Sequence, residues 1–262
     1  MTRWAAGVEY RGTGYAGWQS QDHATGVQQE VERALSSIAD EPVAITAAGR
    51  TDAGVHALGQ VIHFDSTRMR PPHAWLFGAN TRLPPDISLR WVQAAAPDFH
   101  ARYGATARRY RYVIHNGRAR SALLADRASW VIPPLDAAAM HRAAQALLGE
   151  HDFSAFRGAD CQSPTPMRRV IAIRVRRARD FVVLDVEANA FLHHMVRNIV
   201  GVLVAVGEGR QAEAWPGAVL QGRDRTRGGM TVPACGLYFI GPEYPAQFGI
   251  PSPPEPWFPA IP

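Results

Sequence analysis

Gly49-Arg50-Thr51-Asp52-Ala53-Gly54-Val55-His56-Ala57 is a short loop between two apolar runs, Val43–Ala48 and Leu58–Phe64. The loop holds one acid between two glycines, and Arg50 stands two residues before Asp52. A carboxylate fixed in this way beside a cation can act as a nucleophile or a base at neutral pH. A hairpin-type turn explains the same residues, with Asp52 capping backbone N–H groups and Gly54 at a positive φ. Both interpretations stay open on the loop alone.

The residues around this loop predict a first α+β half, assigned to residues 1–104. Val27, Val31, Ala34, Leu35 and Ile38 recur at helical spacing. The expected elements, in order, are strand Trp4–Tyr10, helix Val27–Ile38, strands Val43–Ala48 and Leu58–Phe64, helix Pro71–Gly78 and strand Ile87–Ala94. This β-α-β-β-α-β order is the split βαβ arrangement.

A second α+β half is expected over residues 105–241. Its expected elements are strand Thr106–His115, helix Leu135–Leu148, strands Arg168–Arg179 and Phe181–Ala188, helices Leu192–Val206 and Ala212–Leu220, and strand Gly236–Ile240. The two halves are similar in element content, although no sequence repeat relates them. Residues 242–262 hold eight prolines, which predicts an extended or docked tail.

Composition excludes several classes of protein. The chain has 262 residues and a net charge of +5, and all 28 basic residues are arginine. Without lysine, a Schiff base or a phosphate-loop lysine is impossible, which removes P-loop NTPases and ordinary kinases. Cys161 and Cys235 are too few for a disulfide framework. The longest apolar run, Met195–Val206, is broken by Arg197 and Asn198, so no membrane span is expected. With no secretory signal at the N-terminus, we expect a cytoplasmic protein.

Gly12-x-Gly14-x-x-Gly17 spells the glycine pattern of dinucleotide-binding loops. That pattern works only where a helix begins at once, so that the helix N-terminus meets the pyrophosphate. Here Trp18–Thr25 intervenes without an apolar period. A nicotinamide-dependent oxidoreductase therefore remains only an alternative, and saturable NAD(H) binding would be its test.

Two arginine-rich stretches favour a polyanionic partner. Between Phe99 and Ala125 there is no acid but there are six arginines: Arg102, Arg108, Arg109, Arg111, Arg118 and Arg120. Arginine forks match phosphate oxygens, so RNA phosphate binding is the expected use. Strand alternation puts Tyr110 on the apolar face, which by itself favours a packed tyrosine. A second run between Arg168 and Arg179 is also free of acid and could hold the other side of an RNA stem.

Arg197 stands inside the strongly apolar helix Leu192–Val206, one turn after His193. A rim position that reaches water is one explanation. A cation in so apolar a helix more often has a partner, because an unpaired buried charge is costly. The obvious partner is Asp52. We do not expect His193 and His194 to bind a metal, since adjacent histidines should point apart and no third ligand is suggested. Cys161 has no base nearby in sequence and is not expected to be a nucleophile.

Five segments in the same order resemble the tRNA pseudouridine synthase A family. The first is the Asp52 loop, which is close to the pattern G-R-T-D-x-G-V-H-A. The others are 12–19 (GTGYAGWQ), 99–103 with 107–112 (FHARY and ARRYRY), 191–201 (FLHHMVRNIVG), and 224–226 with 236–238 (DRT and GLY). The resemblance runs from about Val8 to Phe239.

This resemblance implies the fold and the activity. The fold would be α+β, with two similar α/β halves sharing a mainly antiparallel mixed sheet. The activity would be isomerisation of uridines 38, 39 and 40 of the tRNA anticodon stem-loop to pseudouridine. No cofactor and no metal would be needed. The partners would be tRNA and a second copy of the chain, and a homodimer is implied. A non-catalytic RNA-binding module is the alternative.

The resemblance also implies site residues. Asp52 would begin cleavage at the ribose, Arg197 would pair with Asp52, and Tyr110 would stack on the flipped base or help remove its C5 proton. Arg50 would hold the displaced nucleotide or its phosphate. The implied RNA-binding residues are Phe99, His100, Ala101, Arg102, Tyr103, Arg70, Arg118, Asp160, Cys161, Gln162, Ser163 and Pro164.

Overall fold

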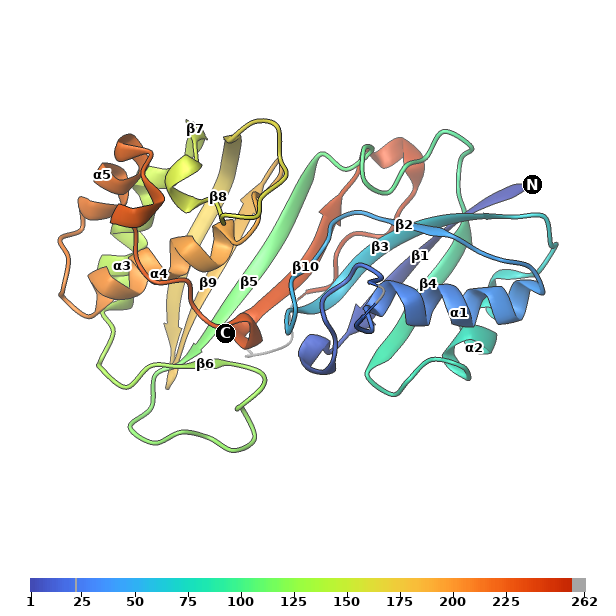
Figure 1. The fold of residues 1–262 in the computed structure, drawn as a ribbon, viewed down its shortest axis with the longest axis horizontal. Coiled ribbons are helices and arrows are strands. Elements are labelled where there is room, and N and C mark those ends of the chain that lie inside the picture. Colours follow the sequence, from blue (N-terminus) through green and yellow to red (C-terminus); the bar gives the residue numbers. More distant parts are fainter. Residues whose placement is uncertain (22, 256–262) are drawn as a thin grey trace. The chain divides into compact units, whose positions relative to one another are not determined.

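A computed structural model describes residues 1–21 and 23–255. These residues form ten strands, most of them paired antiparallel, and five α-helices (Figure 1). The expected α+β fold class is confirmed. The chain divides into two compact units, one made of Met1–Thr106 with Tyr238–Glu255 and the other of Ala107–Leu237. In the described part of the chain, no helix is long and apolar enough to cross a membrane.

The first unit is a sheet with two helices. Its elements are β1 (Thr2–Tyr10), α1 (Val27–Ala39), β2 (Ile45–Ala47), β3 (His56–Ser66), α2 (Pro72–Asn80), β4 (Ile87–Ala94) and β10 (Leu237–Glu243). The strand order is β4-β1-β3-β10, with β2 paired to β3. β10 runs parallel to β3, and the other pairings in this unit are antiparallel.

Both faces of this sheet are covered, which explains why β1 is buried over most of its length. On one face Trp75 of α2 packs on Trp4 and Phe64, with ring centroids 5.8 and 5.1 Å apart. On the other face the segment after β10 packs over a small apolar cluster that includes Phe99. Tyr244 and Phe248 lie edge-on to Phe99, at 5.1 and 5.4 Å.

The second unit also combines a sheet with helices. Its elements are β5 (Ala107–His115), β6 (Ser129–Trp130), α3 (Ala137–Ala144), β7 (Gly149–Asp152), β8 (Met167–Ala178), β9 (Phe181–Ala188), α4 (Met195–Gly207) and α5 (Trp215–Gly222). The strand order is β5-β9-β8-β7, with β6 paired to β5. The helices gather beside β8 and β9 (Figure 1).

Helix α4 is buried on nearly every side, and Arg197 is its only residue that is not fully buried. Such a helix must satisfy its polar side chains internally. Asn198, which is 1% exposed, does so by donating to the carbonyl of Phe156 at 2.8 Å. β5 does not show the expected alternation of burial, because Arg111, Tyr112, Val113 and Ile114 are all buried. The hydroxyl of Tyr112 donates to the carbonyl of Pro233 at 2.8 Å.

Several boundaries differ from the sequence-based expectation. The helix expected at Leu135 starts only at Ala137, because Asp136 caps it by accepting from the N–H groups of Ala138 and Ala139. The short strands β6 and β7 were not expected, since two to four residues carry too little alternation to be recognised.

The expected division into residues 1–104, 105–241 and a tail 242–262 also differs from the observed one. The chain divides after Thr106, and Tyr238–Glu255 belongs to the first unit. The reason is the parallel pairing of Tyr238 with His56 and of Phe239 with Ala57. The tail was expected to be extended or docked, and as far as Glu255 it docks on the first unit. Residues 256–262 lie outside the described residues.

Candidate active site

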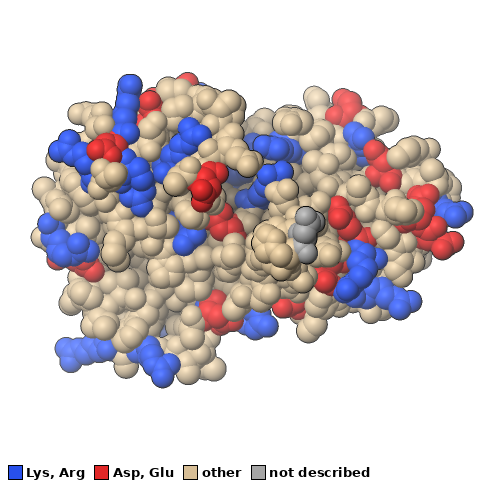
Figure 2. All heavy atoms as spheres, viewed as in Figure 1, with Lys and Arg blue, Asp and Glu red and all other residues tan. Residues whose placement is uncertain are grey.

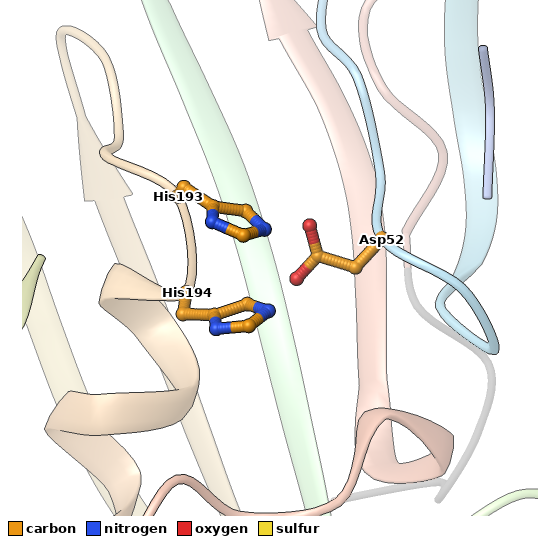
Figure 3. Close-up of side chains that lie close together, drawn as sticks. All are labelled: Asp52, His193 and His194. Carbon is orange, nitrogen blue, oxygen red and sulfur yellow. The ribbon is translucent and has the colours of Figure 1, made fainter. Parts of the chain in front are cut away.

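The Asp52 loop joins β2 to β3 and is held from several directions. The Thr51 hydroxyl is buried against the Tyr10 hydroxyl at 2.8 Å, and the Thr51 carbonyl accepts from the N–H of Trp18 at 3.0 Å. Gln60, also buried, donates to the carbonyl of Gly49 at 2.6 Å. Burial raises the pKa of Tyr10, so its hydroxyl stays protonated. Because its neighbours are fixed, the half-buried Asp52 projects from a rigid loop (Figure 3).

The backbone of the same loop forms a tight turn, as the turn interpretation expects. Gly54 has a φ of +78°, which favours glycine, and the carbonyl of Asp52 accepts from the N–H of Val55 at 3.2 Å. A tight turn and a reactive carboxylate are therefore compatible, since the turn uses the backbone of Asp52. Arg50 is exposed, and its role with the nucleotide stays a prediction.

The glycines of the 12–17 segment pack against this loop. A Cβ on Gly12 would lie 2.0 Å from the carbonyl oxygen of Val55, and one on Gly17 would lie 2.7 Å from that of Thr51. The N–H of Gly12 donates to Nδ1 of His56 at 3.1 Å. Gly14, by contrast, faces open space. The pattern that spells a dinucleotide fingerprint thus serves close contact between two backbones, a use that sequence reasoning missed.

Arg197 lies in the first turn of α4, which begins differently from the expectation. The helix starts at Met195 and not at Leu192, because His194 takes a left-handed conformation with φ of 61°. A non-glycine residue there is strained and often marks a functional site. His193 therefore stands outside the helix, and the expected spacing of one helical turn between it and Arg197 is wrong.

The two adjacent histidines do not point apart, contrary to the expectation. Their rings stack with centroids 3.8 Å apart, as Figure 3 shows, because the left-handed turn at His194 brings them to the same side. Gly158 fits closely against both, and its N–H donates to the carbonyl of His193 at 2.8 Å. The expected RNA-contact loop, residues 160–164, begins two residues after Gly158 and is thereby attached to this pair.

Two further contacts fix candidate catalytic side chains within the second unit. Nε of Arg197 donates to the carbonyl of Val232 at 2.8 Å. Tyr110 is half-buried and lies edge-on to Phe191, with ring centroids 5.0 Å apart and planes at 82°. The packed tyrosine that strand alternation favoured is therefore observed. Its aromatic partner Phe191 carried no signal in the sequence beyond its place in the 191–201 segment.

The expected RNA-binding segment Phe99–Tyr103 begins with buried residues and ends with an exposed one. Phe99 and Ala101 are buried, whereas Tyr103 is 77% exposed and has Arg102 beside its ring. The rings of His100 and Tyr103 have centroids 4.5 Å apart and planes tilted by 33°, and Nδ1 of His100 accepts from the N–H of Tyr103 at 3.1 Å. An exposed ring beside a guanidinium is a common platform for an unstacked base.

His63 holds the buried part of this segment in place. Nδ1 of His63 accepts from the N–H of Ala101 at 3.1 Å, which requires an unprotonated nitrogen. Burial, the neighbouring His100 and the cation of Arg3 lower the pKa of His63 to about 4, and only Asp65 opposes this shift. The unfolded chain therefore binds the additional proton at a higher pH than the folded chain does.

This difference predicts a pH dependence of stability. The stabilisation from neutral His63 is complete above the unfolded pKa of about 6.5, and about 2–3 kcal/mol of it is lost as the pH falls to about 4. Denaturant unfolding between pH 7 and pH 4 measures it. In His63→Asn, whose amide oxygen can accept the same N–H, stability should fall less steeply over this range. Equal slopes for both proteins would contradict the assignment.

Some of the expected phosphate-binding arginines have structural partners instead. Arg111 and Arg176 both donate to the carboxylate of Asp185, at 2.7 and 2.9 Å. Arg111 lies directly opposite Asp185 across the β5–β9 pairing. Arg168 is buried and donates to the hydroxyl of Ser163 at 2.6 Å. Phosphate binding, the expected use of these arginines, does not fit Arg111 and Arg176, because Asp185 on the neighbouring strand neutralises both of them.

The remaining expected RNA-binding residues lie on the surface. Arg70 and Arg118 are exposed, and Arg118 lies in the segment between β5 and β6. Figure 2 shows basic side chains at the lower edge of this unit, over that segment. In the 160–164 loop, Arg157 donates to the carbonyls of Cys161 and Ser163, which leaves Asp160, Gln162 and Pro164 outermost. Their contact with RNA stays a prediction.

A known protein family matches the parts of the chain that hold most of these segments. The sequence model of a family described as tRNA pseudouridine synthase matches residues 6–104 and 143–245. The chain belongs to this family. The matched ranges include the Asp52 loop, the 99–103 segment and Arg197, whereas Tyr110 and Arg118 fall between them.

Full-length relatives carry the same family description. Proteins named tRNA pseudouridine synthase A from Coxiella burnetii (strain Dugway 5J108-111), Hydrogenovibrio crunogenus and Salmonella arizonae are each 53% identical to this chain. The first alignment covers 97% of both chains, the second 96% of both, and the third 95% of this chain and 93% of the relative. Membership in the family therefore holds over nearly the whole chain.

Proposed function

We propose that this chain isomerises uridines 38, 39 and 40 of the tRNA anticodon stem-loop to pseudouridine. Its family membership and the full-length relatives named tRNA pseudouridine synthase A support this function. The observation that carries it is the half-buried carboxylate of Asp52 on a loop whose flanking residues are fixed by hydrogen bonds. A fixed carboxylate suits a step that begins at one ribose carbon.

The reaction breaks the N1–C1′ bond, turns the uracil and joins C5 to C1′. C5 loses a proton and N1 gains one, so atoms balance without a group donor or a redox partner. Asp52 begins the reaction either by attack at C1′ or by removing a ribose proton. Deuterium on the ribose carbon next to C1′ separates the two, because only proton removal gives a primary isotope effect.

The other site residues assist this step. Arg197 pairs with Asp52 and keeps it ionised, and Tyr110 stacks on the flipped base or helps remove the C5 proton. Arg50 holds the displaced nucleotide or its phosphate. The uridine must leave its stack to reach Asp52, and binding to a distorted stem-loop makes this possible.

RNA contacts come from both units. In the first unit Arg102, Tyr103 and Arg70 are exposed. In the second unit Arg118 is exposed, as are Asp160, Gln162 and Pro164 of the 160–164 loop. We place the protein in the cytoplasm, where its tRNA substrate is, and we propose a homodimer in which one tRNA spans both subunits. Size measurement in solution with and without tRNA tests that assembly.

Tritium release from tRNA that carries [5-³H]uridine tests the function. The isomerase releases the label as C5 exchanges its hydrogen for a bond to C1′. An RNA-binding module binds the same tRNA and releases nothing. Mapping the modified uridines in the product then tests the positions, since label release alone reports the chemistry and not the site.

A further inference from the structure

The segment Asp224-Arg225-Thr226 has no part in the chemistry described so far, yet it lies close to α4. Asp224 caps the 3₁₀ turn Arg225–Arg227 by accepting from the N–H and the hydroxyl of Thr226, at 2.9 and 2.7 Å. This cap directs Arg225 inward, and Arg225 is half-buried. A half-buried guanidinium with fixed partners restricts whatever it binds.

Arg225 connects α4 to the chain that follows it. Its Nη2 donates to Oδ1 of Asn198 and to the hydroxyl oxygen of Thr231, both at 2.9 Å, and its Nη1 donates to the carbonyl of Gly229 at 3.0 Å. The hydroxyl of Thr231 donates to Oδ1 of Asn198 at 2.6 Å. Asn198 is buried beside Arg197, so the network fixes the 229–231 backbone to the first turns of the helix.

The same backbone touches α4 directly. A Cβ on Gly201 would lie 1.8 Å from the carbonyl oxygen of Met230, and a Cβ on Gly229 would lie 2.8 Å from the Gly201 backbone. Gly201 is about one turn beyond Arg197. The next residue after Thr231 is Val232, whose carbonyl accepts from Nε of Arg197 at 2.8 Å.

We propose that Arg225 is a positioning residue for Arg197. Arg225 and Asn198 hold the 229–231 segment on α4, which sets the Val232 carbonyl, and that carbonyl fixes the guanidinium plane of Arg197 through Nε. The inference rests on the proposed function, in which Arg197 serves the reaction at Asp52. Without this hydrogen bond the guanidinium plane of Arg197 could rotate and would lose its defined orientation. Small misplacements of a group at a reacting centre slow the reaction strongly.

The test compares Arg225→Met, which keeps length and removes the donors, with Arg227→Met at the other end of the same 3₁₀ turn. Single-turnover tritium release should slow by about 10- to 100-fold in Arg225→Met with KM for tRNA within about twofold. Arg227→Met should match the wild type. Arg225→Lys should recover part of the rate, since one ammonium can still donate to some of these oxygens.

A double-mutant cycle separates positioning from a general loss of structure. In an Arg197→Lys background, which lacks the Nε donor, Arg225→Met should slow the reaction by less than about threefold. If Arg225→Met slowed the reaction by the same factor in both backgrounds, the proposal would be overturned. A wild-type rate in Arg225→Met would overturn it as well. If Arg225→Met does not fold, Thr231→Val provides the same cycle with a smaller change. A wild-type protein that releases no tritium overturns the proposed function and this inference together, whereas an active wild type with an unaffected variant overturns the inference alone.

Discussion

Asp52→Asn should bind tRNA as the wild type does and should isomerise uridine at least about 10⁴-fold more slowly. The amide cannot attack C1′ as a carboxylate does, and it cannot accept a ribose proton. The substitution keeps the shape of the side chain, and the bonds that hold the loop come from Thr51, Gly49 and the backbone of Asp52. The measurement is single-turnover tritium release with saturating enzyme, together with tRNA binding by filter retention.

Asp40→Asn is the matched control for this substitution. Asp40 lies in the same unit at the end of α1, its side chain is 88% exposed, and its left-handed conformation with φ of 55° suits asparagine. We expect its rate and its stability to equal those of the wild type. An Asp52→Asn protein with a wild-type circular dichroism spectrum and an undiminished rate would exclude Asp52 as the initiating group.

The elements with a clear alternation or period were predictable from the sequence. The bounds of Ile87–Ala94 and Phe181–Ala188 agree with the expectation. Polar residues interrupt the apolar pattern before Ile87 and at both ends of Phe181–Ala188. The start of α4 was not predictable, since the apolar run continues through Leu192 and only the backbone conformation of His194 ends the preceding segment. Nor could local pattern show that β10 belongs with β3, because that pairing joins residues about 180 positions apart.

For the candidate site, the sequence predicted which residues to consider but not which residues they contact. The carboxylate of Asp52 stands out in the sequence because its loop lies between two apolar runs, and Arg197 stands out because it lies inside an apolar helix. Asp185, in contrast, looks like an ordinary surface acid until β5 and β9 pair and place it opposite Arg111. Arg225 was visible only as part of a matching segment, since its acceptors on Asn198 and Gly229 lie on separate elements.

Gly12→Ala should lower the stability and the catalytic rate far more than Gly14→Ala, although both change one glycine of the same 3₁₀ turn. A Cβ at Gly12 would lie 2.0 Å from the carbonyl oxygen of Val55, so one of the two backbones must move. Val55 ends the turn that begins at Asp52, and the carboxylate moves with it. Overpacking of this kind costs about 1–3 kcal/mol, and a shift of about 1 Å at the reacting group slows catalysis by about 100-fold.

The paired variants distinguish loop packing from nucleotide binding. A Cβ added at Gly14 would have no other atom within 4 Å. Gly14→Ala should therefore keep the wild-type rate and unfold at the wild-type denaturant midpoint or slightly above it. If the three glycines served a dinucleotide, the wild type would bind NAD(H) saturably and Gly12→Ala would weaken that binding. If they serve the Asp52 loop, NAD(H) does not bind, and tritium release falls in Gly12→Ala alone. Equal rates in the two variants would mean that the backbone contact does not position Asp52.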